Sequence, residues 1–410
     1  MRVALLLAAA IAAATPALGQ VLTLDEARRR ALESQPALNA IKLGAHAAEQ
    51  NAVAEGALPD PRLKLGALNF PTRNFPSARE DMTQVGLSWE QAFPGGDKRR
   101  LRTERAQAEA EQMRAEAIGL RQGIARDVGV AWVDAWQATS ARSLVDELVR
   151  EYARAVELAQ IAVAAAKSPP SDVLAVRQVQ GQAMDRRLEL DAMAQRARSA
   201  LARWLPDAGS RPLPDALPEF SAPASLAAMR EALEHHPLHA MQVSAQGVAE
   251  SEVALAREAT KPDRSIEVGY YTRSGDRSDM LMFQVAFELP IFSAQKQDRS
   301  LQAKLALLER TREQRSDHLR QLRAELEAAY SDWLVAGERL RNLESAILPD
   351  ARARHEALVA QHGAGTALLA SVFEARRGLV EAQLQELALR SARAKARIGL
   401  QYFEHEEGRP

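Results

Sequence analysis

Hydrophobic residues alternate with polar ones in two short segments of the chain. In residues 83–90, Val85, Leu87 and Trp89 fall on one face, and five apolar residues of 281–289 do the same. This period of two is typical of a strand with one apolar and one polar face. A weaker alternation precedes each segment across a polar loop, so the pattern predicts two hairpins. The predicted strands are residues 62–70, 83–91, 264–272 and 280–289.

A second period, of 3.5 residues, follows each hairpin. Apolar residues recur at four-three spacing from Ile124 to Val163, where only Arg142 is charged, and again from Leu319 to Ile347. This spacing predicts very long helices that pack as left-handed coiled coils. Residues 97–166 contain no proline, so one helix could extend over roughly 100 Å at 1.5 Å per residue. A helix of that length is far outside the range of ordinary globular domains.

The same order of elements occurs twice along the chain. The segment ALESQPALNA (31–40) matches ALEHHPLHA (232–240), LPDPRLKLGAL (58–68) matches KPDRSIEVGYY (261–271), and two further segments match in order. The offset stays between 198 and 203 residues, which indicates a tandem duplication. The predicted parts are repeat one (20–204), a proline-rich linker (205–223), repeat two (224–403) and a C-terminal tail (404–410).

Composition narrows the class of protein. Residues 1–19 combine a basic Arg2, an apolar run and small residues at Ala17 and Gly19, which predicts a secretory signal peptide. The absence of cysteine excludes disulfides, thiolate metal sites, a cysteine nucleophile and a lipid anchor on an N-terminal cysteine. The net charge of −1 gives no indication of nucleic acid as a partner. After the signal, no run of about 18 apolar residues predicts a transmembrane helix.

Four strands are too few to cross a membrane alone. Single-chain bacterial barrels begin at about eight strands, and open strand edges are not tolerated in lipid. If the two hairpins enter a membrane, several chains must therefore combine their strands. Three chains would give twelve strands and would also surround the axis with their long helices.

The export signal, the duplication, the hairpin-to-long-helix order and the helix junctions resemble the TolC-like outer-membrane efflux channel family. The segments LPDPRLKLGALNFP and GLSWEQAFPGGDKRRLRTERA are most similar to its heavy-metal cation branch. The resemblance implies a mainly α fold with a membrane β-barrel. It further implies a homotrimer, whose 12-stranded barrel in the Gram-negative outer membrane is continued by an α-helical barrel through the periplasm.

The implied function is that of a passive exit duct, neither an enzyme nor a cofactor protein, with heavy-metal cations as the favoured cargo. The implied partners are a periplasmic membrane-fusion adaptor, an inner-membrane pump of the RND type and outer-membrane lipid. Two alternatives stay open: a drug or organic-solute duct of the same fold, and a periplasmic coiled-coil scaffold or adaptor without a pore. An adaptor would usually have one helical hairpin beside a small β-domain, whereas this sequence has two copies of hairpin plus rod.

The long helices are expected to end at periplasmic tips. In the family, each tip turn carries a glycine, five residues and then an aspartate that starts the return helix. Ala166 replaces the glycine in repeat one, and Ser371 replaces the aspartate in repeat two. The resemblance places Glu374 and Ser371 at the periplasmic gate, although plain helix capping would explain the tip residues equally well. The tip turns expected to contact the adaptor contain Ala166, Lys167, Asp172, Gly363 and Gly365.

The segment WEQAFPGGDKRR (89–100) has glycines before a lysine, as phosphate-binding loops do. A Walker loop needs Gly-x4-Gly-Lys-Ser/Thr, and that spacing is absent. We therefore predict a turn followed by a helix capped by Asp97. The resemblance makes this the joint between β-barrel and helical barrel, with residues 98–100 near the inner lipid surface or the duct wall. The joint residues are Pro94, Gly95, Gly96 and, in repeat two, Pro290.

Histidines 235, 236 and 239 form the one cluster that could suggest a metal site, since imidazoles at short spacing bind zinc or copper. Pro237 interrupts the cluster, and the matching segment of repeat one has no histidine. The pattern therefore favours a helix start over a metal site. No Gly-x-Ser-x-Gly elbow or other catalytic constellation is present.

Overall fold

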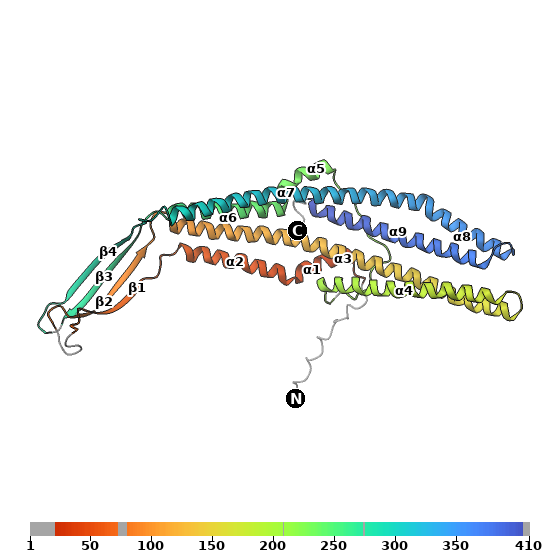
Figure 1. The fold of residues 1–410 in the computed structure, drawn as a ribbon, viewed down its shortest axis with the longest axis horizontal. Coiled ribbons are helices and arrows are strands. Elements are labelled where there is room, and N and C mark those ends of the chain that lie inside the picture. The colour runs from red at the N-terminus through yellow and green to blue at the C-terminus, as the bar shows by residue number, and fades with distance from the viewer. Residues whose placement is uncertain (1–20, 73–79, 208, 274, 405–410) are drawn as a thin grey trace, which may run out of the picture. The chain divides into compact units, whose positions relative to one another are not determined.

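The computed structural model describes residues 21–72, 80–207, 209–273 and 275–404. The predicted signal peptide and nearly all of the predicted C-terminal tail lie outside these ranges. Helices predominate, and the strands form one four-stranded sheet (Figure 1), which confirms the mainly α fold class with two hairpins. Within the described residues, no helix combines the length and the apolar character needed to cross a membrane.

The chain divides into two compact units. Unit two contains residues 36–120 and 233–322, and unit one contains the remaining segments, 1–35, 121–232 and 323–410. Each unit takes segments from both predicted repeats. Two long helices, α3 (Lys98–Ala164) and α7 (Gln297–Asn342), begin in unit two and end in unit one.

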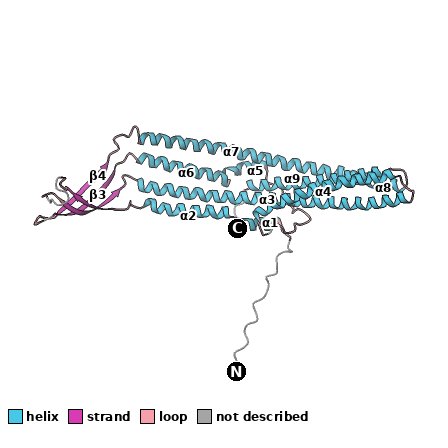
Figure 2. Cartoon of the chain, turned by 60° about the horizontal axis from the view of Figure 1, so that its bottom comes forward, coloured by secondary structure: helices cyan, strands magenta, loops and turns pink. Residues whose placement is uncertain are grey.

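Unit two combines the sheet with four helical segments, which Figure 2 shows as separate magenta and cyan parts. It contains α2 (Pro36–Gly56), β1 (Arg62–Leu68), β2 (Gln84–Phe93), the start of α3, a short 3₁₀ turn η1 (Leu233–His235), α6 (Pro237–Glu258), β3 (Asp263–Arg273), β4 (Met280–Glu288) and the start of α7. Unit one contains α1 (Leu24–Ser34), the rest of α3, α4 (Pro170–Trp204), α5 (Leu226–Ala232), the rest of α7, a π-helical turn η2 (Leu343–Ile347), α8 (Leu348–Gly363) and α9 (Leu369–Phe403).

The sheet has the order β1-β2-β3-β4 and is antiparallel throughout. Its centre is therefore the pairing of β2 from repeat one with β3 from repeat two, and β1 and β4 are its edges. β1 ends at Leu68, before the predicted end at residue 70, because Asn69 adopts a left-handed φ of 58° that strands do not continue through. β2 extends to Phe93 because the ladder with β3 continues to Arg264.

The two faces of the sheet differ in polarity. On one face, Leu63, Trp89, Val268 and Phe283 form a row across all four strands, and Leu65 in the next row is 85% exposed. On the other face, the Lys64 ammonium lies 2.7 Å from Glu90 and 2.8 Å from Glu267. The period-two pattern therefore produces an exposed apolar face opposite a charged one.

The core of unit one follows the predicted 3.5-residue period. The predicted positions of α3 that are buried are Ile124, Val128, Ala131, Ala135, Val145, Val149, Tyr152 and Ala159. Several of them pack against Ala183 and Leu190 of α4 and Val380 of α9 in one hydrophobic cluster. Arg142, the charged exception, is exposed and pairs with Asp191 of α4.

The long helix of repeat two departs from its predicted pattern at one place. The π turn η2 interrupts it, and Pro349 follows in the first turn of α8. A π turn adds one residue, so the buried stripe moves by one position. Ile347, predicted to be buried, is 42% exposed, and Leu348 packs instead with Leu340, Leu343 and Leu389.

Candidate functional site

The predicted joint of repeat one is bound tightly to the link between α6 and β3. Lys98, at the start of α3, is buried and donates from Nζ to the Lys261 carbonyl and to Asp263 Oδ1, both at 2.7 Å. The same carboxylate oxygen accepts the Gly95 amide at 2.6 Å. The Asp97 amide donates to Glu258 at 3.0 Å, so repeat two holds both sides of the turn.

The two glycines of this joint are required by geometry. Gly96 has a φ of +60°, and a Cβ atom at Gly95 would lie 2.0 Å from the Pro262 carbonyl oxygen. Only a residue without a side chain fits at such a close approach of two backbones. The glycines that resembled a phosphate loop thus allow the turn after β2 to approach the α6–β3 link.

The structure shows which groups the three cations after the turn bind. Lys98 lies inside the joint, Arg99 donates to the Gly56 carbonyl, and Arg100 pairs with Asp97 and Glu104. α3 begins directly after Asp97, as predicted, but the Asp97 carboxylate binds the Arg100 side chain. The cations are therefore held by neighbouring groups of the same chain.

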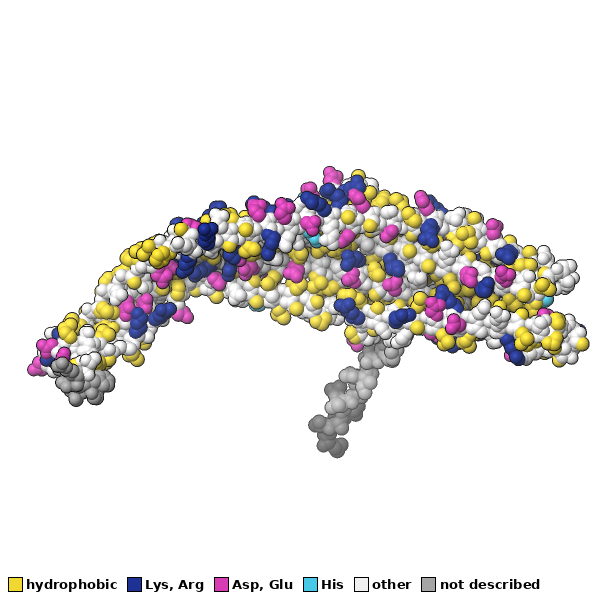
Figure 3. All heavy atoms as spheres, viewed as in Figure 1, with side chains coloured by type: hydrophobic (Ala, Val, Ile, Leu, Met, Phe, Trp, Pro, Cys, Tyr) yellow, Lys and Arg dark blue, Asp and Glu magenta, His cyan; other side chains and the backbone are white. Residues whose placement is uncertain are grey.

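The joint of repeat two, around Pro290, differs from that of repeat one. A series of turns lies between β4 and α7. In these turns the Ile291 amide donates a hydrogen bond to the Leu289 carbonyl, and the Asp298 amide donates one to the Ser293 carbonyl. Ile291 and Phe292 are 76% and 73% exposed. On the face shown in Figure 3, hydrophobic side chains gather where the strands are followed by helices. In repeat one, Phe93 and Pro94 are half-buried.

The two predicted tip turns have the same backbone structure. Ala166 and Gly365 both adopt left-handed φ angles, of 56° and 77°. The Lys167 amide donates to the Ala162 carbonyl at 2.9 Å, and the Thr366 amide donates to Gln361 at the same distance. Both turns therefore end their helices in the same way, with alanine replacing glycine in repeat one.

Exchanging these two residues is expected to shift local stability in opposite directions. A left-handed conformation costs an L-residue with a Cβ atom about 1 kcal/mol or more. Ala166→Gly should therefore stabilise the first tip by about 1 kcal/mol, and Gly365→Ala should destabilise the second by a similar amount. Hydrogen exchange of the tip amides checks this, and slower exchange in Gly365→Ala would contradict it.

Neither return helix has a side-chain hydrogen bond at its N-cap. α4 begins at Pro170, because proline suits the first helical position. Asp172 lies in its first turn and accepts from Ser168 Oγ. Ser371 is in the first turn of α9, whose N-cap is Leu368 without a side-chain bond, and Glu374 is exposed one turn further along. Gly363 is the last residue of α8.

Just beyond Glu374, α9 is joined to α3 by contacts that the sequence did not indicate. Arg376 forms two bonds to Glu151, of 2.6 and 2.7 Å. Next to this pair, the Tyr152 and Phe373 rings meet edge to face at 5.3 Å. Burial raises the pKa of Tyr152 to about 12, so its hydroxyl stays protonated and donates to the Phe373 carbonyl at 3.3 Å.

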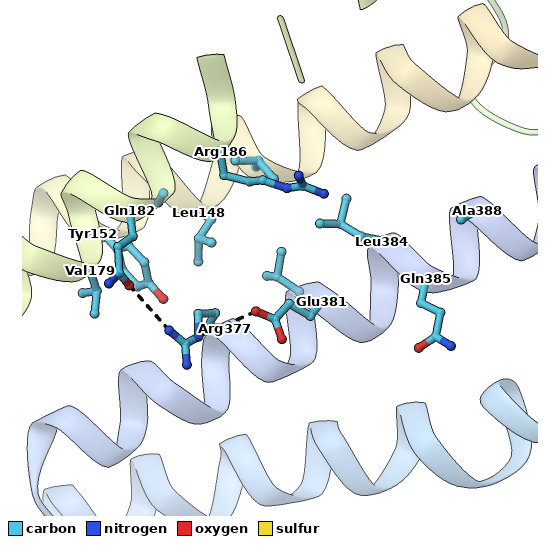
Figure 4. Close-up of a pocket in the computed structure, with 13 residues that line it drawn as sticks. Leu148, Tyr152, Val179, Gln182, Arg186, Arg377, Glu381, Leu384, Gln385 and Ala388 are labelled. Carbon is cyan, nitrogen blue, oxygen red and sulfur yellow. Dashed lines mark hydrogen bonds and ion pairs between the residues drawn. The ribbon is translucent and has the colours of Figure 1, made fainter. Parts of the chain in front are cut away.

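A groove of about 620 Å³ lies beside these contacts, between α3, α4 and α9 (Figure 4). Leu148, Val179 and Leu384 give it an apolar floor, and Arg377 at its rim lies between Gln182 and Glu381. No single residue type marked this groove in the sequence, because each helix supplies only part of its wall.

The three clustered histidines diverge in the structure. His236 is buried, and its Nδ1 accepts the Leu238 amide at the start of α6. His239 is buried beside Arg315, whereas His235 is exposed. Within the described ranges, no group of three His, Asp or Glu residues is placed to hold a metal ion.

His239 is expected to make unit two sensitive to acid. Burial and the nearby Arg315 lower its pKa below the ordinary 6.5; Glu234 opposes this shift in part, and His318 adds to it. The unfolded chain therefore binds a proton first, so stability is lost as the pH falls from about 6.5 through the folded pKa. His239→Gln should flatten the dependence of the melting temperature between pH 7 and 5. The exposed His46→Gln is the control, and an unchanged slope in His239→Gln would contradict the expectation.

Comparison with known proteins relates both predicted repeats to one protein family. The profile of the outer membrane efflux protein family matches residues 27–205 and 228–402, one match in each predicted repeat. The cobalt-zinc-cadmium resistance protein CzcC of Cupriavidus metallidurans is 26% identical over 373 residues, which are 90% of this chain and 86% of that protein.

Two solved structures share the fold over nearly their full length. CusC superimposes with a TM-score of 0.79 at 16% identity and covers 94% of this chain and 93% of its own. VceC of Vibrio cholerae has a TM-score of 0.77 at 18% identity, over 93% and 95% of the two chains. The family profile and these structures confirm the resemblance predicted from the hairpins, the long helices and the duplication.

Proposed function

The chain belongs to the outer membrane efflux protein family, and from this premise we propose that it is the outer-membrane exit duct of a tripartite efflux system. The family consists of passive channels, so the chain is not an enzyme. In the proposed assembly, three copies surround one pore, and an inner-membrane pump of the RND type supplies the energy through a periplasmic adaptor.

The sheet is the observation that carries this proposal. It exposes a row of large apolar side chains on one face and has charged groups on the other, as a wall between lipid and a wet lumen requires. Its edge strands β1 and β4 have unpaired backbone groups, which lipid does not tolerate. Three sheets joined edge to edge would form a twelve-stranded barrel without edges.

Heavy-metal cations are the proposed cargo. The support is the relative CzcC, whose name states resistance to cobalt, zinc and cadmium. The alternative is a drug or organic-solute duct of the same fold. Growth of the native host without this protein separates the two, because a metal duct predicts sensitivity to these three cations with unchanged tolerance of hydrophobic drugs.

Pore formation can be tested with the purified full chain. We expect a trimer by mass measurement in detergent and stepwise ion conductance in a planar bilayer. A monomer that conducts nothing would reject the duct and favour the scaffold without a pore. The tip turns at Ala166–Asp172 and Gly363–Gly365 are the proposed contacts of the adaptor.

Glu374 is the proposed acidic group of the periplasmic gate. Its side chain is exposed on α9 near the second tip, and three copies around an axis would concentrate negative charge there. Glu374→Gln should therefore lower the preference of the pore for cations over anions. Glu157→Gln, another exposed carboxylate of unit one, is the control. Equal selectivity in Glu374→Gln and wild type would remove Glu374 from the constriction.

A further inference from the structure

The joint of repeat two lacks the ion pair that holds the joint of repeat one. Lys296 is the repeat counterpart of Lys98, 198 residues later, and Asp60 is the counterpart of Asp263, 203 residues earlier. Lys98 and Asp263 are 2.7 Å apart. Lys296 and Asp60 are both exposed, and neither has an ion-pair partner within the described parts of the chain.

The order of the strands explains why these two residues do not meet within one chain. Lys98 follows β2 and Asp263 begins β3, and these strands are neighbours at the centre of the sheet. Lys296 follows β4 and Asp60 precedes β1, which are opposite edges of the same sheet. Lys296 can therefore meet the counterpart of Asp263 only in another copy of the chain.

We propose that Lys296 of one copy binds Asp60 of the partner subunit, and that β4 pairs with β1 of the partner subunit in the register of β2 with β3. This interface rests on the trimer of the proposed function and specifies how its subunits meet. The internal contact between the two repeats is the template for the ion pair and the strand register, because Lys296 and Asp60 occupy the repeat positions of Lys98 and Asp263. The turn itself is not copied, since Ser293 stands at the repeat position of Gly95.

The register that this template gives is consistent in polarity. Trp89 opposite Val268 becomes Phe287 opposite Leu65 of the partner subunit, and Gln91 opposite Ile266 becomes Leu289 opposite Leu63 of the partner subunit. Apolar residues thus meet apolar residues on one face. A shift of a single residue would turn every side chain of β4 to the wrong face.

The polar face agrees with the same register. Glu90 opposite Glu267 becomes Glu288 opposite Lys64 of the partner subunit, so opposite charges face each other. The exposed Ile291 and Phe292 correspond to the half-buried Phe93 and Pro94 of repeat one. The α2–β1 link of the partner subunit would lie beside them, as the α6–β3 link lies against Gly95 after Pro94.

Disulfide trapping tests the register directly, because the chain has no cysteine of its own. Directly opposed antiparallel residues have Cα atoms about 4.5–5.5 Å apart, within the range for a disulfide. Oxidised Leu65→Cys/Phe287→Cys should therefore migrate as a covalent trimer on a denaturing gel. The matched control, Lys64→Cys/Phe287→Cys, has its thiols on opposite faces and should remain monomeric.

The outcomes separate this interface from the proposed function. A conducting trimer without the disulfide, or with more of it in the control, would overturn the interface and leave the duct intact. A wild-type chain that forms neither trimer nor pore would overturn both.

Charge exchange tests the ion pair. Lys296→Asp and Asp60→Lys should each reduce the trimer that resists detergent at room temperature, because each places like charges together. The double variant Asp60→Lys/Lys296→Asp should restore the trimer toward the wild-type amount. Lys42→Asp changes an exposed lysine of α2 in the same way and should have no effect. A double variant less trimeric than either single variant would overturn the pairing.

Discussion

Gly95→Ala is expected to prevent the joint of repeat one from closing. The added Cβ atom would lie 2.0 Å from the oxygen and 2.8 Å from the carbon of the Pro262 carbonyl. Both atoms belong to backbone, so no side chain can rotate away. The turn must then move, which separates the Gly95 amide and Lys98 from Asp263. We expect a loss of about 3 kcal/mol or more in the free energy of unfolding.

A second glycine of unit two provides the matched control. A Cβ atom added at Gly247, inside α6, has no neighbour within 4 Å. Gly247→Ala should therefore be neutral or stabilise the helix by about 0.5–1 kcal/mol. Melting temperatures of the two variants in detergent measure the difference. Similar melting temperatures for Gly95→Ala and wild type would show that the joint tolerates a wider turn.

Arg376→Ala is expected to loosen α9 from α3 and raise the conductance of the pore. The substitution removes both bonds to Glu151 and leaves that carboxylate without its cation, next to the Tyr152–Phe373 contact. Loss of a bidentate, half-buried pair costs about 1–2 kcal/mol. If α9 must separate from α3 for the entrance to widen, this loss increases the open population about tenfold for each 1.4 kcal/mol.

The neighbouring arginine distinguishes a specific bond from a general loss of charge. Arg377 is exposed, 3.7 Å from Glu381 and 3.5 Å from Gln182. Contacts this long at the surface contribute little. Arg377→Ala should therefore leave single-channel conductance unchanged, and Arg376→Lys should restore part of the closed state. Equal conductance in Arg376→Ala and Arg377→Ala would show that the Glu151 bond does not hold the entrance.

Periodicity predicted the elements of this fold but not the contacts between the repeats. The positions of α3 from Ile124 to Ala159 are buried as the 3.5-residue period required, because coiled-coil packing is local to neighbouring helices. The Lys98–Asp263 pair joins residues 165 apart, and no period connects them. The duplication does mark both positions, since Lys98 has a matching lysine at 296 and Asp263 has a matching aspartate at 60.

The tips show a different limit of sequence patterns. The sequence shows Ala166 in place of the family's glycine, but its left-handed conformation is known only from the hydrogen bonds that close the turn. The Arg376–Glu151 contact could not be predicted, because many exposed arginines of these helices find carboxylates at similar spacing. Burial and bidentate geometry set this pair apart, and both are properties of the packed helices.

The π turn η2 accounts for a difference in length between the two repeats. Lys98 and Lys296 are separated by 198 residues, whereas Ala166 and Gly365 at the tips are separated by 199. Repeat two is thus one residue longer between joint and tip, and a π turn is how a helix accommodates one inserted residue without losing its direction. Deletion of Ser345 would give repeat two the joint-to-tip length of repeat one and should replace the π turn by regular α-helix.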